Sequence, residues 1–202
     1  MLAGPFNHWV SMGPVMVFLL LWGAPTLTLG LGMFSANVGT VLTIFAIATV
    51  ITGPLSGFVS ARLGSKRAII GFITPMIQAA LWIALFTLAD KVSFQLGLVS
   101  AIMFAISFSS PVANFGFDTI RERLDRHVMV AGTGIANMGA YSCAMLDTQL
   151  IGALLDWYAD GHAYTWSDFQ VAWLGLGAVW VAGMIGLAVC LYLQHKQRRQ
   201  GA

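Results

Sequence analysis

The chain alternates between long apolar stretches and short polar segments. Six stretches of about twenty residues, the length needed to cross a bilayer as a helix, run approximately over Trp9–Gly30, Asn37–Phe58, Ala68–Ala89, Phe94–Phe117, Met129–Leu155 and Phe169–Leu193. The pattern predicts an all-α fold with six transmembrane helices. We expect a single six-span bundle over residues 1–202, in which residues 194–202 form a cytoplasmic tail.

Composition supports a membrane protein and excludes several other classes. The chain is 58% hydrophobic and 9% charged, whereas a soluble domain is about 25% charged. The net charge of +2 is too small to indicate nucleic-acid binding. Both cysteines, Cys143 and Cys190, fall in apolar stretches and are interpreted as packing residues. No metal-ligand motif is present, so we expect neither a metal nor a cofactor.

Basic residues are concentrated on one side of the predicted membrane. Lys91 alone falls on the other side, and the remaining basic residues are Arg62, Lys66, Arg67, Arg121, Arg123, Arg126, Lys196, Arg198 and Arg199. Because cytoplasmic segments carry an excess of Lys and Arg, both termini are predicted to be cytoplasmic. The expected location is the bacterial inner (plasma) membrane.

Polar side chains are distributed unevenly among the predicted spans. The third and sixth stretches are almost wholly apolar, whereas the second, fourth and fifth carry many hydroxyl and amide groups. Polar side chains are costly in hydrocarbon and should face protein or water. We therefore expect the third and sixth spans to be outermost. Two triplets that each end in a lipid-facing helix are the pattern of a 3+3 inverted repeat.

The segment GPLSGFVSARLGSKR joins the second and third stretches. It resembles the cytoplasmic signature of each half of major facilitator superfamily transporters, roughly Gly-x-Leu-x-Asp-Arg-x-Gly-Arg-Arg/Lys. The matching positions are Gly57, Arg62, Gly64 and Lys66, and the departures are Val59, Ala61 and Ser65. NFGFDTIRERLD and AGTGIANMGAYSCAMLDTQLIGALLDW are similar to the tenth and eleventh helices of that superfamily. The chain thus resembles the C-terminal half of such a transporter along nearly its whole length.

This resemblance implies secondary active transport of a small solute, by symport or antiport with alternating access. It also implies a cytoplasmic gating motif formed by Gly57, Arg62, Gly64, Lys66 and Arg67, in which the glycines permit close helix approach. Since Ala61 replaces the acidic residue of the signature, Arg62 is expected to pair elsewhere, with Asp118 or Glu122 as candidates. The alternative interpretation is that the basic residues only anchor the topology.

The fifth stretch contains the candidate coupling residue, Asp147. A stripe of small residues with a four-residue spacing suits close helix packing, and its members are Gly132, Ala136, Ala140 and Ala144. Asp147 follows Ala140 by seven residues and lies about 20° from it around a helix, so it should point into the bundle. An inward carboxylate within a span is a candidate site for a proton or a cation. The alternative is a structural role near the outer interface.

Further polar residues are weaker candidates for a cavity wall, and hydrogen bonding to neighbouring helices is the favoured interpretation for each; they are Ser110, Asn114, Asn137 and Tyr141. An enzyme is not expected. Ser56 lies in a Gly-rich setting, but an intramembrane serine protease also needs a histidine deep in a span, and the sequence places none there.

The resemblance also implies a missing part, because superfamily transporters hold their substrate between two six-span halves. The expected partners are the lipid bilayer, a small-molecule solute, and either a separate N-terminal half or a second copy of this chain. A non-transporting membrane subunit and a channel-like six-helix protein remain as alternatives.

Overall fold

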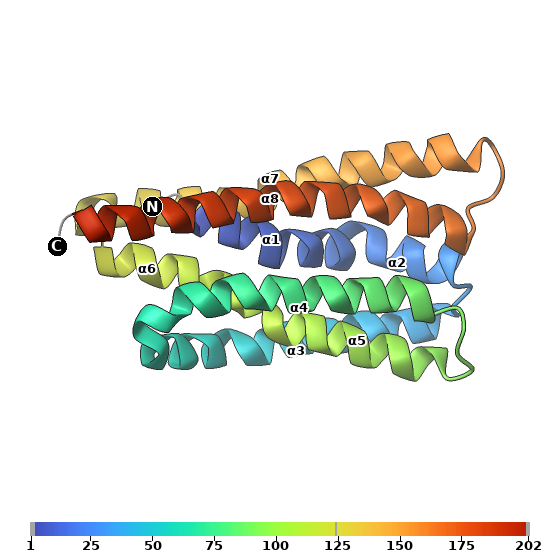
Figure 1. Ribbon diagram of the computed structural model, residues 1–202. Helices are drawn as coiled ribbons and strands as arrows, with labels where there is room; N and C mark the ends of the chain where they lie inside the picture. Colours follow the sequence, from blue (N-terminus) through green and yellow to red (C-terminus); the bar gives the residue numbers. More distant parts are fainter. Residues whose placement is uncertain (1–2, 124, 201–202) are drawn as a thin grey trace.

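The computed structural model describes residues 3–123 and 125–200 and shows long helices packed side by side (Figure 1). The first helical stretch comprises α1 (Ala3–Val17), the π-helical η1 (Phe18–Trp22), the short α2 (Gly23–Pro25) and the π-helical η2 (Thr26–Gly30). The other elements are α3 (Ser35–Leu63), the 3₁₀ turn η3 (Gly64–Lys66), α4 (Arg67–Leu88), α5 (Gln95–Ser109), the 3₁₀ segment η4 (Ser110–Asn114), α6 (Phe115–Arg123), α7 (Arg126–Ala159) and α8 (Trp166–Gln200).

Length and composition make most of these helices compatible with a membrane. Among the described residues, five helical stretches are long and apolar enough to cross a bilayer, namely Ala3–Gly30, Ser35–Leu63, Arg67–Leu88, Gln95–Asp118 and Trp166–Gln197. The 34-residue α7 is not among them. α8 continues through the basic C-terminal segment to Gln200, so the expected tail extends the last helix.

The first helical stretch lies at the centre of the bundle. α1 packs along α7 and α8 and also contacts η4, α6 and α4, while α3 packs along α5. In its most apolar window 56% of the residues of Ala3–Gly30 are buried, the highest share among these stretches. This placement explains why the small residues of α1 and α7 face each other, as described below.

An aromatic cluster forms the middle of the main core. Phe18, at the start of η1, packs against Phe45 of α3, Trp82 of α4 and Trp173 of α8, with ring centroids 5.3–5.9 Å apart. Phe18 and Phe45 are completely buried. Rings from four elements therefore meet at one place, and burying such large side chains fixes how these helices are spaced.

The outer faces agree only in part with the expected order of the spans. α4 and α8 expose mainly apolar side chains such as Ile73, Ile83, Leu174 and Ile185. However, α3 was expected to lie inside, and only 28% of its most apolar window is buried, the same share as in α4. The buried share therefore does not distinguish an inner second span from an outer third span.

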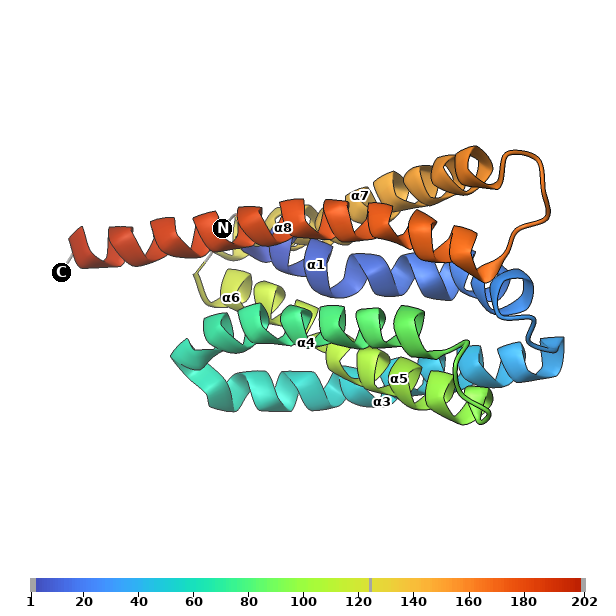
Figure 2. The same ribbon diagram turned by 45° about the vertical axis from the view of Figure 1, so that its right-hand side comes forward.

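The connections and termini divide between the two ends of the bundle (Figures 1 and 2). The α3–α4 turn and the far end of α6 lie toward the end where both termini are drawn, and the α7–α8 loop lies at the opposite end. This arrangement brings the predicted cytoplasmic segments to one end.

Cysteine labelling tests the predicted sidedness. Lys66 and Ala163 are exposed at opposite ends of the bundle, so Lys66→Cys and Ala163→Cys should react with an impermeant thiol reagent from opposite sides of a membrane. The native Cys143 and Cys190 are buried, and the parent chain provides the control for their reactivity. Labelling of both variants from the same side would refute the predicted topology.

Candidate functional site

The candidate site is a buried carboxylate on α7. Asp147 has no exposed surface. One carboxylate oxygen, Oδ2, accepts a hydrogen bond of 3.2 Å from the Cys143 thiol one turn earlier. The other oxygen, Oδ1, is buried and has no hydrogen-bond partner among the described residues. A buried oxygen of this kind is costly for an ionised group, which makes Asp147 a place where a proton or cation changes the local energy strongly.

Close packing of α1 on α7 buries this carboxylate. A Cβ atom on Gly13 would come within 2.4 Å of the Cys143 sulfur, and one on Gly139 within 1.9 Å of the Pro5 carbonyl oxygen. Ala136 and Ala140 of the predicted stripe are completely buried. Small residues therefore bring the two backbones together, and the face that carries them also turns Asp147 inward.

An irregular part of the first span lies beside this site. The Trp22 indole, at the end of η1, donates a hydrogen bond of 3.3 Å to the carbonyl of Thr148, the residue after Asp147. The same ring lies beside Gly152, where a Cβ atom would be in ordinary van der Waals contact with it at 3.4 Å. π-Helical turns within α-helices are frequent at functional sites. Asp147 is thus adjacent to a segment with non-standard backbone hydrogen bonding.

The four cavity candidates do not form one wall. Ser110 is buried and donates 2.9 Å to the Ser107 carbonyl, and Asn114 is half-buried in the same 3₁₀ segment. Asn137 is exposed on α7, and Tyr141 is 54% exposed. Ser110 therefore serves the local backbone, whereas Asn137 and Tyr141 lie on the outer surface of this chain.

The residues of the predicted gating motif are mostly exposed, and Arg67 is the exception. The Arg62 guanidinium lies over the Phe58 ring, 3.8 Å from its centroid. Asp118, one partner considered for Arg62, instead accepts a 2.5 Å hydrogen bond from Ser60 and lies 3.6 Å from Arg121. Glu122, the other candidate partner, has a side chain outside the described part of the structure.

Arg67 connects the motif to the bundle. Its side chain is 9% exposed, and its Nε donates a 2.7 Å hydrogen bond to the Ser60 carbonyl. Ser60 therefore joins Arg67 of α4 to Asp118 of α6. Lys66 is exposed on the η3 turn.

The two glycines of the motif, Gly57 and Gly64, differ in backbone conformation but have similar surroundings. Gly64 has φ +49°, a backbone conformation that an L-residue adopts only with strain. Nothing lies within 4 Å of a Cβ atom built on Gly57 or on Gly64. The expected close helix approach at these glycines is therefore wrong within this chain, because their surroundings are open space.

Two buried residues near the N-terminus were missed by the sequence interpretation. His8 is 3% exposed and Asn7 is 6% exposed. Both donate to backbone carbonyls of η4. The sequence interpretation placed no histidine deep in a span, and His8 lies buried near the start of α1. The only signal available was the position of both residues directly before an apolar stretch. Ser56 donates to the Gly53 carbonyl of its own helix, and His8 donates to the Ala113 carbonyl. Neither hydrogen bond joins the serine to the histidine, as the pair in a serine protease would require.

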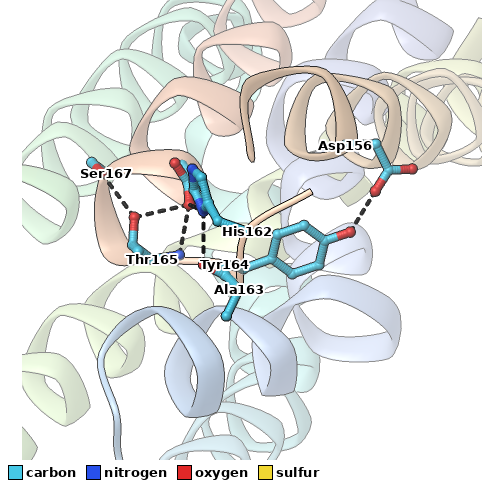
Figure 3. Close-up of polar contacts among 7 residues, drawn as sticks. Asp156, His162, Ala163, Tyr164, Thr165 and Ser167 are labelled. Carbon is cyan, nitrogen blue, oxygen red and sulfur yellow. Dashed lines mark hydrogen bonds and ion pairs between the residues drawn. The ribbon is translucent and has the colours of Figure 1, made fainter. Parts of the chain in front are cut away.

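A second polar cluster lies in the loop between α7 and α8 (Figure 3). Tyr164 donates a hydrogen bond to Asp156, and this bond raises the pKa of Tyr164 above its usual value. The backbone N–H and hydroxyl of Thr165 both donate to Asp168, at 2.7 and 2.8 Å. The bond from the Thr165 N–H is one half of a capping box, in which an acidic residue three positions into the helix accepts from the N-cap N–H. These contacts stabilise the start of α8 and the loop before it, so a structural role accounts for the polar residues of this cluster.

No family model, no curated protein and no solved structure matches this chain. The geometry therefore carries the functional argument. Among the described residues it offers no group of three or more His, Cys, Asp or Glu side chains suited to a metal ion. It does offer a fully buried carboxylate with an unpartnered oxygen, Asp147, between closely packed helices.

Proposed function

We propose that the protein is one half of a secondary active transporter and moves a small solute by alternating access, coupled to protons. The observation that carries this proposal is the complete burial of Asp147 with one unpartnered oxygen. Ionisable groups inside membrane bundles commonly belong to proton or ion pathways. Proton coupling requires at least one group that binds and releases a proton, and a single carboxylate meets this requirement.

The packing pattern supports a 3+3 inverted repeat. α1 packs along α7 and α8, and α5 packs along α3 and α4. In a 3+3 repeat, α1 corresponds to α5, α3 to α7, and α4 to α8. The contacts of α1 with α7 and α8 then correspond to the contacts of α5 with α3 and α4. An inverted repeat predicts this correspondence, and so does the resemblance to major facilitator superfamily transporters.

A complete transporter in this proposal needs a second six-helix unit, either a separate N-terminal half or a second copy of the chain. α7 supports a further partner, because it exposes Asn137, Tyr141 and Gln149 beside Met138 and Met145. Amide groups are costly in lipid, whereas a protein surface or a water-filled cavity can satisfy them. The bacterial inner membrane with both termini in the cytoplasm remains the proposed location.

The gating role of the cytoplasmic motif is part of the same proposal. In this proposal the second six-helix unit packs against the open surface at Gly57. The alternative is that the basic residues of the motif only anchor the topology. Gly57→Leu should leave stability within about 0.5 kcal/mol of the parent, since the position is exposed. If the second unit docks there, transport should fall. Normal transport by Gly57→Leu would favour the anchor.

Reconstitution tests the transport proposal. Proteoliposomes that contain the chain and an internal pH dye are exposed to a panel of amino acids, sugars, organic acids and amines under an imposed proton gradient. A transporter should give a solute-dependent pH change that saturates, whereas a channel-like protein should give a current without saturation. Absence of both responses, with the chain alone and with a co-expressed six-span partner, would refute transport.

A further inference from the structure

The fourth helical stretch is interrupted in its middle. α5 ends at Ser109, the five-residue 3₁₀ segment η4 follows, and α6 begins at Phe115. Pro111 has no backbone N–H and leaves one helical hydrogen bond unmade at this point, whereas α3 and α4 remain helical through Pro54 and Pro75. A 3₁₀ segment in mid-helix often occurs at a hinge, and in Figures 1 and 2 α6 continues the path of α5 toward the end where both termini are drawn.

Side chains compensate for the hydrogen bonds lost at this break. On the α5 side, the Ser110 hydroxyl donates to the Ser107 carbonyl at 2.9 Å. The Gln78 amide of α4 donates to the Ile106 carbonyl at 3.3 Å. Ser107 also hydrogen-bonds Thr49 of α3, with the two hydroxyl oxygens 2.5 Å apart. α5 is therefore fixed to α3 and α4 up to the break.

On the other side of the break the partners come from α1. The Asn7 amide donates to the carbonyls of Val112 and Ala113, both at 3.2 Å. His8 Nδ1 lies 3.0 Å from the Ala113 carbonyl oxygen. Because a carbonyl oxygen only accepts, the nitrogen must carry the proton and donate. Two adjacent residues of α1 thus bind the last carbonyls of η4.

The same two turns of α1 also contact α6. The His8 ring lies against Phe117, with centroids 4.4 Å apart. A Cβ atom on Gly116 would lie 3.0 Å from the Gly4 Cα atom, so the two backbones are close. At the α3 side, Ser60 holds Asp118. α6 therefore packs against α1 and α7 and touches α3, while α5 packs against α3 and α4.

We propose that η4 is a hinge and that Asn7 and His8 form a clamp that holds α6 in its present orientation. α5 and α6 then move as separate bodies when the clamp releases. This hinge would let the cytoplasmic end of the fourth span change position without disturbing α5. The inference goes beyond the proposed transport function and does not depend on Asp147.

Hydrogen–deuterium exchange of the purified full chain in detergent tests the clamp. In the double variant Asn7→Leu/His8→Leu, the carbonyls of Val112 and Ala113 lose their side-chain donors and keep the backbone N–H of Phe115. Loss of buried hydrogen bonds is costly, so amide exchange in peptides that cover residues 110–123 should accelerate about tenfold or more. Exchange in residues 96–105 of α5 should change little.

Ser11→Ala is the matched control. Ser11 is equally buried on the same helix, but its hydroxyl has no hydrogen-bond partner among the described residues. This variant should exchange like the parent. Acceleration spread evenly over all helices in the double variant would show that the pair stabilises the whole bundle, and unchanged exchange would show that it holds nothing. Either result overturns the clamp.

Pro111→Ala tests the hinge even if the double variant does not fold. Alanine restores the backbone N–H and favours a continuous helix. Exchange at residues 112–115 should therefore slow, because the break becomes more helical. Unchanged or faster exchange there would contradict a hinge whose opening depends on Pro111.

Discussion

Gly139→Ala is expected to destabilise the bundle by about 3 kcal/mol or more. The added Cβ atom would lie 1.9 Å from the Pro5 carbonyl oxygen and 2.7 Å from its carbon. Both are backbone atoms of α1, so no flexible side chain can move aside. The helices must separate, and this separation would loosen the packing that buries Cys143 and Asp147. Thermal or denaturant unfolding of the purified protein in detergent measures the effect.

Gly134→Ala is the matched control on the same helix. Nothing lies within 4 Å of a Cβ atom at this position. Alanine is also the better helix former by about 1 kcal/mol, so this variant should equal or exceed the parent in stability. Similar stability of the two variants would mean that α1 and α7 do not approach each other as closely as the structure shows.

Apolar length predicted the helices well, because crossing a bilayer demands long uninterrupted stretches. The prediction placed the first helix at Trp9, whereas α1 begins at Ala3. The prediction began too late because Asn7 and His8 are polar and lower the local hydropathy before Trp9. They are buried because η4 supplies carbonyl acceptors, and these acceptors lie more than a hundred residues away in the chain.

The break in the fourth span had a visible signal in Pro111, but proline alone does not reveal a five-residue 3₁₀ segment or its partners. Kinked helices often retain proline when neighbours supply hydrogen bonds. Here the neighbours are Gln78 of α4 and Asn7 and His8 of α1. Such partners follow from tertiary packing, which one sequence does not specify.

Helical periodicity placed Asp147 on the inner face, because it shares that face with Ala136 and Ala140. The same reasoning does not assign a role to isolated polar residues. Asn137 and Tyr141 stay candidates for a cavity wall, and both are exposed on α7 within this chain. Polarity within a span indicates that a side chain avoids lipid, but it does not say whether its partner lies in this chain or in another.

Asp147→Asn is expected to lower gradient-driven solute accumulation to the level of empty vesicles. Asparagine keeps the shape of the side chain and a carbonyl oxygen that can accept from Cys143, but it fixes the neutral form. Coupling requires that proton binding from one side favours one access state and that release to the other side favours the second state. A permanently neutral side chain removes this difference between the states, so a proton gradient can no longer drive uptake.

Exchange of internal for external solute separates a coupling role from a structural one. It requires no net proton movement, so Asp147→Asn should retain exchange while it loses accumulation. Asp156→Asn is the matched control, because Asp156 lies on the same helix but is exposed in the outer loop region. Both activities should survive there. If Asp147→Asn accumulates solute as well as the parent, the carboxylate is a packing element whose unpartnered oxygen has no part in coupling. A loss of exchange and accumulation together, with lowered thermal stability, would likewise assign Asp147 to the architecture of the α1–α7 contact.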